Sequence, residues 1–285
     1  MKRIAIIGLG LIGGSMALAL KRAEVANWEV VGYARRPEVA AKALSLGAVD
    51  RAEADLFSAV EGAHIVLLAT PAMAIQGILA RIAGGLAPGC IVTDTASTKA
   101  QVMKWAEELL PSSVSFIGGH PMAGKEASGI EAADAGLFQG CTYCMVPGRG
   151  AAREAIDEVV EVVKLVGAKP LFLDASEHDS LVAGISHLPL VLSAALVATT
   201  TKSPFWPMMA RLAATGFRDL SRLASGNPGM SRDICLTNRE PILRWIDEYI
   251  GELRRFRHLV SEDAIGLEEA FFRAREERER WLQGI

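Results

Sequence analysis

The chain has 285 residues, of which 51% are hydrophobic and 22% charged, and its formal net charge is −3. This length and composition are typical of a globular protein, most simply one with two domains, and exclude a disordered or collagen-like chain. The slightly acidic balance argues against nucleic acid as the main partner, because phosphate binding requires a basic surface. Four cysteines are too few for a disulfide framework in a chain of this length, which favours a reducing, cytoplasmic location.

Strand and helix patterns alternate over residues 1–173. Short apolar runs bounded by turn residues predict strands, and the segments between them have helical composition. The predicted strands are 4–8, 29–33, 65–69, 90–93, 115–117, 142–146 and 171–173, and the clearest helices are 11–21, 37–46 and 151–166. This alternation predicts an α/β fold with a mostly parallel sheet covered by helices.

After the last predicted strand the pattern is helical to the end of the chain, interrupted by prolines. We therefore place a domain boundary near Asp174, with a first domain at 1–173 and an all-α domain at 174–285. The segment Leu181–Thr201 contains no Asp, Glu, Lys or Arg and could be mistaken for a membrane span. Because it carries His187, Pro189 and several hydroxyl side chains, a helix buried within the protein is favoured and no membrane association is expected. Its apolar surface indicates a homodimer.

The first predicted strand leads into Gly8-Leu9-Gly10-Leu11-Ile12-Gly13, which has the GxGxxG spacing of a dinucleotide-binding turn. In such a turn the first glycine permits the tight bend, the second lets the backbone approach a pyrophosphate, and the third lets helix and strand pack closely. The N-terminus of the following helix offers free N–H groups to the phosphates. The motif predicts a Rossmann-type domain at 1–173, and we include Thr70 and Pro71 among its cofactor-binding residues.

The end of the second strand bears on the choice of cofactor. An acidic side chain there would bond the ribose 2′-hydroxyl of NAD. The sequence instead reads Tyr33-Ala34-Arg35-Arg36, with no acid before Glu38. Arginine offers forked donors to phosphate oxygens, so Arg35 and Arg36 favour NADP, with NAD possible. The alternative is that both arginines are ordinary surface charges.

Three further segments contain polar residues in positions that suggest chemistry. Two of them, Asp94-Thr95-Ala96-Ser97-Thr98-Lys99 and Gly118-Gly119-His120-Pro121-Met122-Ala123-Gly124, follow predicted strands, where open α/β sheets bind ligands. The third comprises Ser186-His187-Leu188-Pro189 and the later segment 216–224, GFRDLSRLA, which contains Arg222. A histidine in a loop rich in glycine and proline is not typical of a core residue.

These segments together resemble the prephenate dehydrogenases, also called arogenate or cyclohexadienyl dehydrogenases, of tyrosine biosynthesis. The resemblance extends over nearly the whole chain through GLGLIGGS, DTASTK, GGHPMAGKEASGIEAA, SHLP and GFRDLSRLA, of which GGHPMAG is the most specific. It implies a Rossmann domain followed by a helical domain that forms dimers. It also implies hydride transfer from the ring C4 carbinol to NAD(P)+ with loss of CO2, which converts prephenate to 4-hydroxyphenylpyruvate or arogenate to tyrosine.

The resemblance also implies roles for four residues. His120 would act as the general base for the C4 hydroxyl, and Ser97 would hydrogen-bond that hydroxyl and the histidine. Arg222 would bind a substrate carboxylate, with the ring carboxylate favoured, and His187 would orient the substrate side chain. No metal is expected, because the cofactor takes the hydride and aromaticity drives decarboxylation.

Some alternatives remain open. Leu190 and Ser231 replace a histidine and a tryptophan that are frequent in the family, so the preference between prephenate and arogenate is open. The chain could be another two-domain dehydrogenase of the β-hydroxyacid type, but these use a helical-domain lysine, and after His187 none occurs before Lys202. It could also be a non-catalytic NADP-binding sensor. Without the resemblance, Arg222 could be a solvated helix residue and His187 an ordinary buried histidine.

Two other patterns have structural interpretations. Ser176-Glu177-His178-Asp179 has the spacing of a capping box and predicts a helix N-terminus at Ser176. Cys141 and Cys144 match C-x-x-C, but there is no second cysteine pair, and on a strand these side chains would face opposite ways, so no metal or redox centre is expected. No regulatory domain after the helical domain and no fused mutase domain are expected either.

Overall fold

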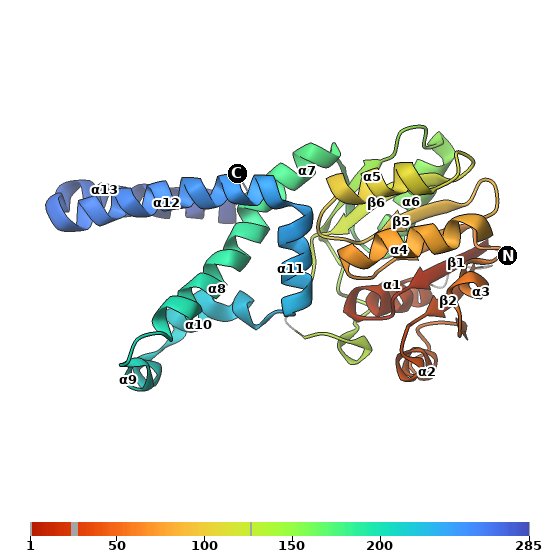
Figure 1. Cartoon of the computed structure of the whole chain (residues 1–285), viewed down its shortest axis with the longest axis horizontal. Helices are drawn as coiled ribbons and strands as arrows, with labels where there is room; N and C mark the ends of the chain where they lie inside the picture. Colours follow the sequence, from red (N-terminus) through yellow and green to blue (C-terminus); the bar gives the residue numbers. More distant parts are fainter. Residues whose placement is uncertain (1, 24–27, 126, 285) are drawn as a thin grey trace. The chain divides into compact units, whose positions relative to one another are not determined.

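The computed structural model of the chain describes residues 2–23, 28–125 and 127–284 (Figure 1). It contains two compact units, Met1–Arg239 and Glu240–Ile285. The first unit contains all the residues that the sequence singles out for binding or catalysis, and it is the one on which the functional argument depends.

An eight-stranded sheet forms the centre of the first unit, in the order β3-β2-β1-β4-β5-β6-β7-β8. The strands are β1 (Lys2–Ile7), β2 (Trp28–Tyr33), β3 (Arg51–Glu53), β4 (Ile65–Leu68), β5 (Ile91–Asp94), β6 (Ser115–Pro121), β7 (Thr142–Pro147) and β8 (Lys169–Phe172). All neighbouring strands are parallel except β6 and β7. The predicted α/β fold with a mostly parallel sheet is confirmed. Only the short edge strand β3, in which two of three residues are charged, has no counterpart in the prediction.

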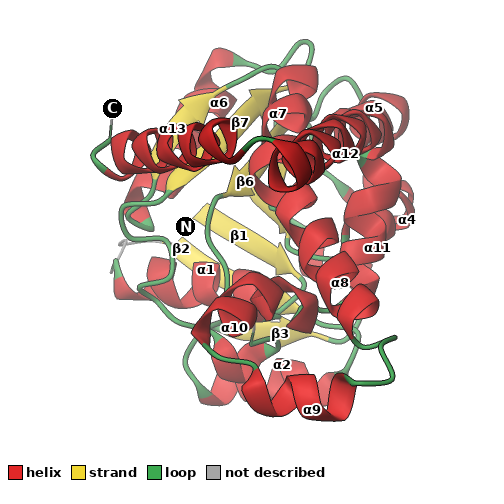
Figure 2. Cartoon of the chain, turned by 90° about the vertical axis from the view of Figure 1, so that its left-hand side faces the viewer, coloured by secondary structure: helices red, strands yellow, loops and turns green. Residues whose placement is uncertain are grey.

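Helices cover both faces of this sheet, as Figure 2 shows. One face packs against α1 (Leu11–Arg22), α2 (Pro37–Ser45) and α6 (Arg153–Leu165), and the other against α3 (Leu56–Val60), α4 (Ala72–Ile82) and α5 (Ala100–Leu109). Alternation along β1 explains this arrangement, because Ile4 and Ile6 join the core beneath α1 and α6, whereas Ala5 and Ile7 join the core beneath α3–α5. Helices α4 and α5 lie side by side (Figure 1). Short 3-10 turns, η1 (Ala83–Gly85) and η2 (Ile130–Ala132), connect other elements.

The strand order reverses between β1 and β4. From β1 the chain proceeds outward to β2 and β3 and then returns to place β4 on the opposite side of β1. Ligands of open α/β sheets bind at such a reversal, beyond the carboxyl ends of the strands. The residues after Ile7 and after Leu68 therefore border the expected ligand crevice.

The first unit continues as helices after the sheet. These are α7 (Ala175–Val182), η3 (Ala183–His187), α8 (Leu188–Thr200), α9 (Trp206–Leu212), α10 (Thr215–Ser221), η4 (Arg222–Ser225) and α11 (Pro228–Thr237). The segment η3 is a π-helical turn directly before α8, which has Pro189 in its first turn. Proline has no N–H and crowds the preceding turn of an α-helix, so a wider turn accommodates it. This turn ends on His187.

One helix in the described part of the chain, Ala175–Thr200, is long and apolar enough to span a membrane by length and composition. Only 28% of its most apolar window is buried within the chain. Within one chain, the expectation of a helix buried within the protein is therefore only partly met. Apolar side chains such as Leu181 and Ile185 are exposed to solvent, which is unfavourable unless another surface packs against them.

The second unit consists of two long helices, α12 (Arg239–Glu262) and α13 (Ala264–Leu282). The Asp263 side chain between them accepts a hydrogen bond from the Gly266 N–H at 2.9 Å and so caps α13. The rings of Phe256 and Phe271 meet edge to face with centroids 5.5 Å apart. Phe272 and Trp281 are exposed, so this unit also presents apolar side chains to solvent.

Candidate active site

The glycine motif forms the turn that its spacing predicts. Gly8 follows β1 with φ of +103°, and its N–H donates to the Tyr33 carbonyl at 2.8 Å. A Cβ on Gly8 would overlap the Ala69 carbonyl, and one on Gly13 would overlap the Gly8 carbonyl, so the turn requires glycine at both positions. A Cβ on Gly10 would have no neighbour within 4 Å, which leaves the backbone there open to close approach.

The remaining residues of the motif complete the start of α1. Leu9 is buried, whereas Leu11 and Ile12 are partly buried in the first turn. Gly10 is the N-cap and contributes no side-chain hydrogen bond, and the first turn contains no acidic residue. The N–H groups of the first turn, which have no partner within the helix, and the positive end of the helix dipole are therefore available to an anion.

A second feature of this crevice also fits a nucleotide. Thr70 and Pro71 follow β4, and Pro71 is the N-cap of α4. The Thr70 Oγ1 is buried and has no hydrogen-bond partner within the described part of the chain. Because buried hydroxyl groups are normally paired, this atom fits a site that a ligand would complete. The turn, the helix N-terminus and Thr70 together fit a dinucleotide cofactor.

Arg35 and Arg36 lie where the sequence predicts, directly after β2. Both are exposed. Among the described residues, their ion pairing is limited to one long contact, from Arg36 Nε to a Glu38 carboxylate oxygen at 3.9 Å. Exposed pairs at this separation contribute little, so both guanidinium groups are accessible to an anionic ligand.

A buried ion pair connects β5 to β6 next to the predicted catalytic residues. Lys99 is fully buried, and its Nζ pairs with the Asp94 carboxylate and donates to the Gly119 carbonyl at 2.6 Å. Asp94 also accepts hydrogen bonds from the Gly119 N–H at 3.1 Å and the Ala96 N–H at 2.8 Å. Burial lowers the pKa of Lys99, although Asp94 opposes this effect. These bonds hold the loop after β5 against β6.

His120 lies within β6, directly after Gly119, and the prediction from the sequence that it lies in a loop is wrong. Its register partner on the antiparallel strand β7 is Cys144. The Gly–Gly–His–Pro composition suggested a loop, but these residues pair with β7. The close approach of Asp94 and Tyr143 explains why Gly119 has no side chain. His120 is consequently held by a rigid element.

A chain of hydrogen bonds leads from His120 into α7. His120 Nδ1 lies 2.9 Å from His178 Nε2, and His178 Nδ1 lies 2.8 Å from Asp179 Oδ1. Asp179 accepts two further bonds at the start of α5, from the Lys99 N–H at 2.7 Å and the Ala100 N–H at 2.8 Å. The carboxylate therefore joins α7 to the N-terminal end of α5.

The structural interpretation of residues 176–179 as a capping box is wrong. Helix α7 begins at Ala175 with Asp174 as its N-cap, so Ser176 lies inside the helix. His178 and Asp179 are buried against the predicted base, from which His178 is 58 residues distant in sequence. An adjacent histidine and aspartate beside an apolar helix was the only signal that could have identified them.

The surroundings of His120 keep its ring uncharged. Its side chain is only 8% exposed, and burial lowers its pKa well below the ordinary value, with further lowering by electrostatic interactions with His178, Lys99 and His187. A neutral imidazole is the form that can accept a proton.

His187 is likewise buried and neutral. Burial, aided by His178, lowers its pKa to about 4 against the opposing effects of Asp179 and the Ser97 backbone. The Asn238 amide donates to the Asp179 carbonyl at 2.8 Å and lies 3.1 Å from His187 Nδ1. Since an amide nitrogen only donates, Nδ1 accepts and the proton of the neutral ring is on Nε2. The buried Nε2 has no partner that meets strict hydrogen-bond geometry within the described residues, although the Ser97 backbone acts as an acceptor for the ring and raises its pKa.

Ser97 and Arg222, the other two predicted site residues, occupy different surroundings. Ser97 is half-buried in the loop between β5 and α5. Its backbone raises the pKa of His187. Arg222 is exposed at the start of η4, a turn that packs against α8 through a hydrogen bond from the Ala224 N–H to Ser193 Oγ at 2.9 Å. The structure thus groups His120, His187 and the Ser97 loop, whereas Arg222 lies on a solvent-exposed turn.

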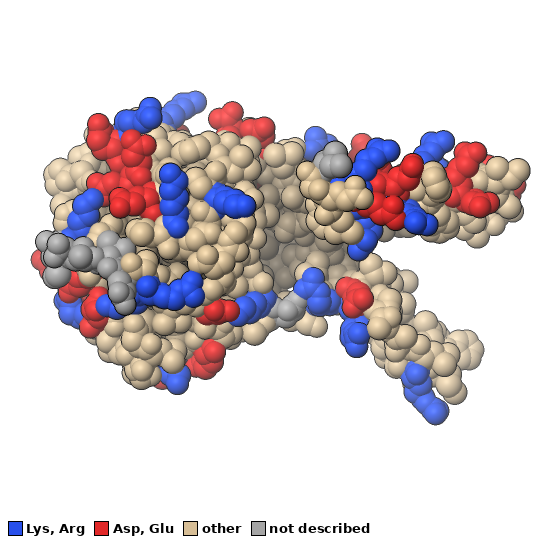
Figure 3. All heavy atoms as spheres, turned by 180° about the vertical axis from the view of Figure 1, so that it is seen from behind, with Lys and Arg blue, Asp and Glu red and all other residues tan. Residues whose placement is uncertain are grey.

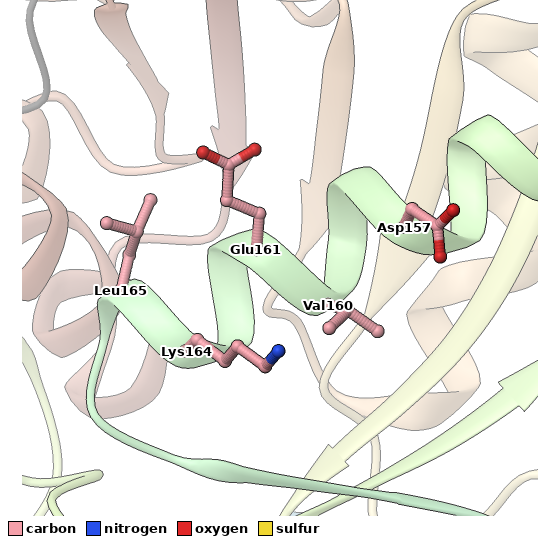
Figure 4. Close-up of a pocket in the computed structure, with 5 residues that line it drawn as sticks. All are labelled: Asp157, Val160, Glu161, Lys164 and Leu165. Atoms are coloured by element: carbon pink, nitrogen blue, oxygen red, sulfur yellow. The ribbon is translucent and has the colours of Figure 1, made fainter.

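Surface hollows and charges do not suggest a second site. The pocket in Figure 4 is formed by Asp157, Val160, Glu161, Lys164 and Leu165, all on α6, and includes none of the predicted site residues. Another hollow beside α5 also includes none of them. No three His, Cys, Asp or Glu side chains within the described ranges group as metal ligands. Basic and acidic side chains are interspersed on the face shown in Figure 3.

Comparisons with known proteins identify the family. Residues 16–171 match the model of the prephenate dehydrogenase nucleotide-binding domain, and residues 174–273 match that of the prephenate dehydrogenase dimerization domain. The chain is 38% identical over 279 residues to prephenate dehydrogenase of Bacillus subtilis strain 168, covering 97% of this chain and 75% of that protein.

Two solved structures are similar over their whole length. The crystal structure of Synechocystis arogenate dehydrogenase is 32% identical, with a TM-score of 0.82 over 98% of this chain and 99% of that one. Prephenate dehydrogenase from A. aeolicus, solved with hydroxyphenyl propionate and NAD+, is 28% identical, with a TM-score of 0.91 over 98% of each chain. With the nucleotide-binding turn and the buried histidines in place, these matches confirm the predicted resemblance: the chain belongs to the prephenate dehydrogenase family of oxidoreductases.

Proposed function

We propose that this chain catalyses the NAD(P)-dependent oxidative decarboxylation of prephenate to 4-hydroxyphenylpyruvate, or of arogenate to tyrosine. The observation that carries the proposal is the buried, neutral His120, held on a strand in the same unit as a turn that fits a dinucleotide. The names of the relatives from B. subtilis, Synechocystis and A. aeolicus support this substrate class.

Each of the four site residues has a separate role in the proposed reaction. His120 accepts the proton of the C4 hydroxyl, and Ser97 hydrogen-bonds the same hydroxyl. When bound, the nicotinamide ring supplies the acceptor for the C4 hydride. As C4 becomes a carbonyl carbon, the C1–carboxylate bond breaks to release CO2, and its electron pair completes the aromatic ring. Arg222 holds the ring carboxylate, and the Nε2–H of His187 donates to the substrate side chain.

For the cofactor, NADP is the preferred form in this proposal. Arg35 and Arg36 are exposed after β2, and no acidic residue lies between the end of β2 and Glu38. Within the described residues, neither guanidinium has a close carboxylate partner. Two forked donors at the ribose position would bind a 2′-phosphate.

The organisation of the whole protein is part of the proposal. A dinucleotide-binding domain at 1–173 is followed by a helical domain at 174–285, because the alternation of strands and helices ends with β8. The match to a dimerization domain and the exposed apolar helices support a homodimer. A biosynthetic oxidoreductase with free cysteines is consistent with the cytoplasm and with a small-molecule substrate.

A spectrophotometric assay of NADPH and NADH formation tests the function. The purified protein is incubated with prephenate and with arogenate, each with NADP+ and with NAD+. We expect reduction of cofactor with at least one of the two substrates, accompanied by CO2. Turnover only with a β-hydroxyacid would favour the alternative dehydrogenase, and cofactor binding without any turnover would favour a sensor.

A further inference from the structure

The hydrogen bonds behind His120 determine which of its nitrogens can act. We propose that Asp179 and His178 are positioning residues that hold the Nδ1 proton of His120, so that the lone pair is on Nε2 and faces away from α7. The catalytic part of this inference rests on the proposed function, but the position of the proton does not.

Asp179 determines the direction of the hydrogen bonds in this chain. Its two carboxylate oxygens accept bonds from the Lys99 N–H and the Ala100 N–H, at the N-terminus of α5. Backbone donors at a helix N-terminus favour the carboxylate form, which can accept hydrogen bonds but not donate them. His178 Nδ1, 2.8 Å from Asp179 Oδ1, must therefore carry the proton in this bond.

The hydrogen bond between His178 and His120 determines the tautomer of His120 in the same way. A neutral His178 with its proton on Nδ1 presents a lone pair at Nε2. This atom lies 2.9 Å from His120 Nδ1, so His120 Nδ1 must donate. In a neutral ring the other nitrogen, Nε2, is then the one without a proton and is available as a base.

The arrangement also accounts for the fate of the charge. When His120 Nε2 takes a proton, the ring becomes a cation whose Nδ1–H remains bonded to His178. His178 in turn is hydrogen-bonded to the Asp179 carboxylate. Only the His178 ring therefore separates the positive charge on His120 from the negative charge on Asp179. Besides burial, electrostatic interactions with His178, Lys99 and His187 all lower the pKa of His120, and Lys99 itself interacts with Asp94, Asp179 and Cys144. Because these groups oppose protonation of His120, we expect the carboxylate of Asp179, at the end of the hydrogen-bond chain, to compensate the charge.

Both side chains that hold the His120 ring are buried. His178 is 0% exposed and Asp179 is 2% exposed. Water therefore cannot replace either bond without opening the contact between α5, α7 and β6, and the assignment does not depend on a surface rotamer.

The first test measures the tautomer directly. The protein is labelled with 15N in its histidine rings, and two-bond 15N–1H correlation spectra are recorded at neutral pH, with the His120 signals assigned by their loss in His120→Asn. We expect a protonated Nδ1 and an unprotonated Nε2 on His120. A protonated Nε2 in the wild-type spectrum would overturn the proposal, whatever substrate the enzyme uses.

Two substitutions at His178 provide a matched pair. In His178→Leu, His120 Nδ1 has no acceptor, so the Nε2-protonated form should appear and kcat should fall on the order of a hundredfold or more. In His178→Gln, the amide can donate to Asp179 and accept from His120, so the tautomer and much of kcat should be retained. KM should change less than about threefold in both, because neither side chain is assigned to substrate binding.

Asp179→Asn tests the origin of the network. It removes the group that requires His178 Nδ1 to donate, so we expect a mixture of His120 tautomers and a fall in kcat. Because Asp179 also caps α5, Asp55→Asn is the control: Asp55 caps α3 in the same way, with bonds to the Phe57 and Ser58 N–H groups at 3.0 and 2.9 Å. That control should leave kcat and the spectrum unchanged.

The outcomes separate the two proposals. If His178→Leu and Asp179→Asn both keep the wild-type tautomer and kcat, the positioning role is wrong. If the tautomer behaves as expected but neither prephenate nor arogenate is oxidised, the proposed function fails and the proton assignment stands. Should His178→Leu not fold, the wild-type and His178→Gln spectra still decide the tautomer.

Discussion

At the scale of single residues, neighbours decide the chemistry of His120 and His187. Both are histidines in the first unit, yet His120 shares a bond with another imidazole, whereas His187 is bonded by the Asn238 amide. By the hydrogen-bond arguments above, the free nitrogen is a lone pair on His120 and an N–H on His187. One ring is therefore suited to accept a proton and the other to donate a hydrogen bond.

Replacing His120 should remove the base while leaving substrate binding largely intact. An amide does not titrate near neutral pH, so in His120→Asn we expect kcat to fall on the order of a hundredfold to ten-thousandfold. In the wild type, kcat/KM should rise with pH through an ionisation below about 6.5, because the pKa of His120 is lowered. This limb should be absent in the variant, and initial rates from pH 5 to 9 measure it.

The matched comparison is Arg222→Ala. If this arginine holds a carboxylate, KM should rise sharply while kcat changes less. Near-normal turnover and an unchanged pH limb in His120→Asn would place the base elsewhere.

Arg35→Asp should alter the choice of cofactor. A carboxylate repels a 2′-phosphate but can accept a hydrogen bond from a 2′-hydroxyl, so NADP affinity should fall far more than NAD affinity. Fluorescence titration with both cofactors measures the two dissociation constants. Equal small losses for both would refute the 2′-phosphate role.

His187 should make the fold less stable in mild acid. Its pKa is about 4 in the folded protein against about 6.5 unfolded, so only the unfolded chain binds this proton between these values. The free energy of unfolding should therefore be unaffected by this group above pH 6.5 and decrease as the pH falls toward 4. The slope contributed is at most about 1.4 kcal/mol per pH unit.

Urea unfolding of wild type and His187→Gln at several pH values, at one protein concentration, measures this slope. The decrease between pH 6.5 and 4 should be smaller in the variant. Parallel curves would show that His187 is not held neutral by burial.

At the scale of elements, most of the sheet was predictable because its strands are local apolar runs. The strands at β1, β2, β4, β5, β7 and β8 agree with the structure to within a few residues. The misplaced elements have physical reasons: β6 extends through two glycines, a histidine and a proline, and α7 starts before Ser176. In β6, pairing with β7 outweighs the local preference of the residues, whereas α7 starts after Asp174, a residue type favoured at N-caps.

The glycine turn allows packing to be separated from cofactor binding. Gly13→Ala places a methyl group against the Gly8 carbonyl, so we expect a loss of about 1–3 kcal/mol in unfolding free energy together with weak cofactor binding. Gly10→Ala meets no atom within 4 Å, so stability should be nearly unchanged while affinity for NAD(P) falls, because the methyl group occupies the approach to the pyrophosphate.

Gly77→Ala is the control, because Gly77 lies within α4 and its Cβ would also be unobstructed. It should be neutral or slightly stabilising and should bind cofactor normally. Unchanged affinity in Gly10→Ala would mean that the cofactor does not approach this turn closely. Thermal unfolding and cofactor titration measure the two effects.

At the scale of the whole molecule, the apolar helices after the sheet need a covering surface. Phe205 and Leu212, at the two ends of α9, are 73% and 76% exposed. We expect a homodimer of about 60 kDa by analytical ultracentrifugation at micromolar concentration, twice the 30.4 kDa of the chain. A monomer at every concentration would contradict this.

Charged substitutions locate the interface. Leu212→Glu should weaken the dimer, since a carboxylate cannot be buried against apolar side chains without cost. Leu44→Glu is the matched control, because Leu44 is an exposed leucine on α2, beside the sheet. The sedimentation coefficient of this control should remain that of the wild type.

The sequence by itself determined the α/β alternation, the glycine turn, the helical second half and the family, because these depend on residue type and short spacing. It also pointed to His120, Ser97, His187 and Arg222 through family segments. Only the tertiary structure decided that His178 and Asp179 lie behind His120, since α7 and β6 meet across 58 residues of chain. The lowered pKa values and the inferred tautomers are also decided only by the tertiary structure, because burial and hydrogen-bond partners exist only after the elements pack together.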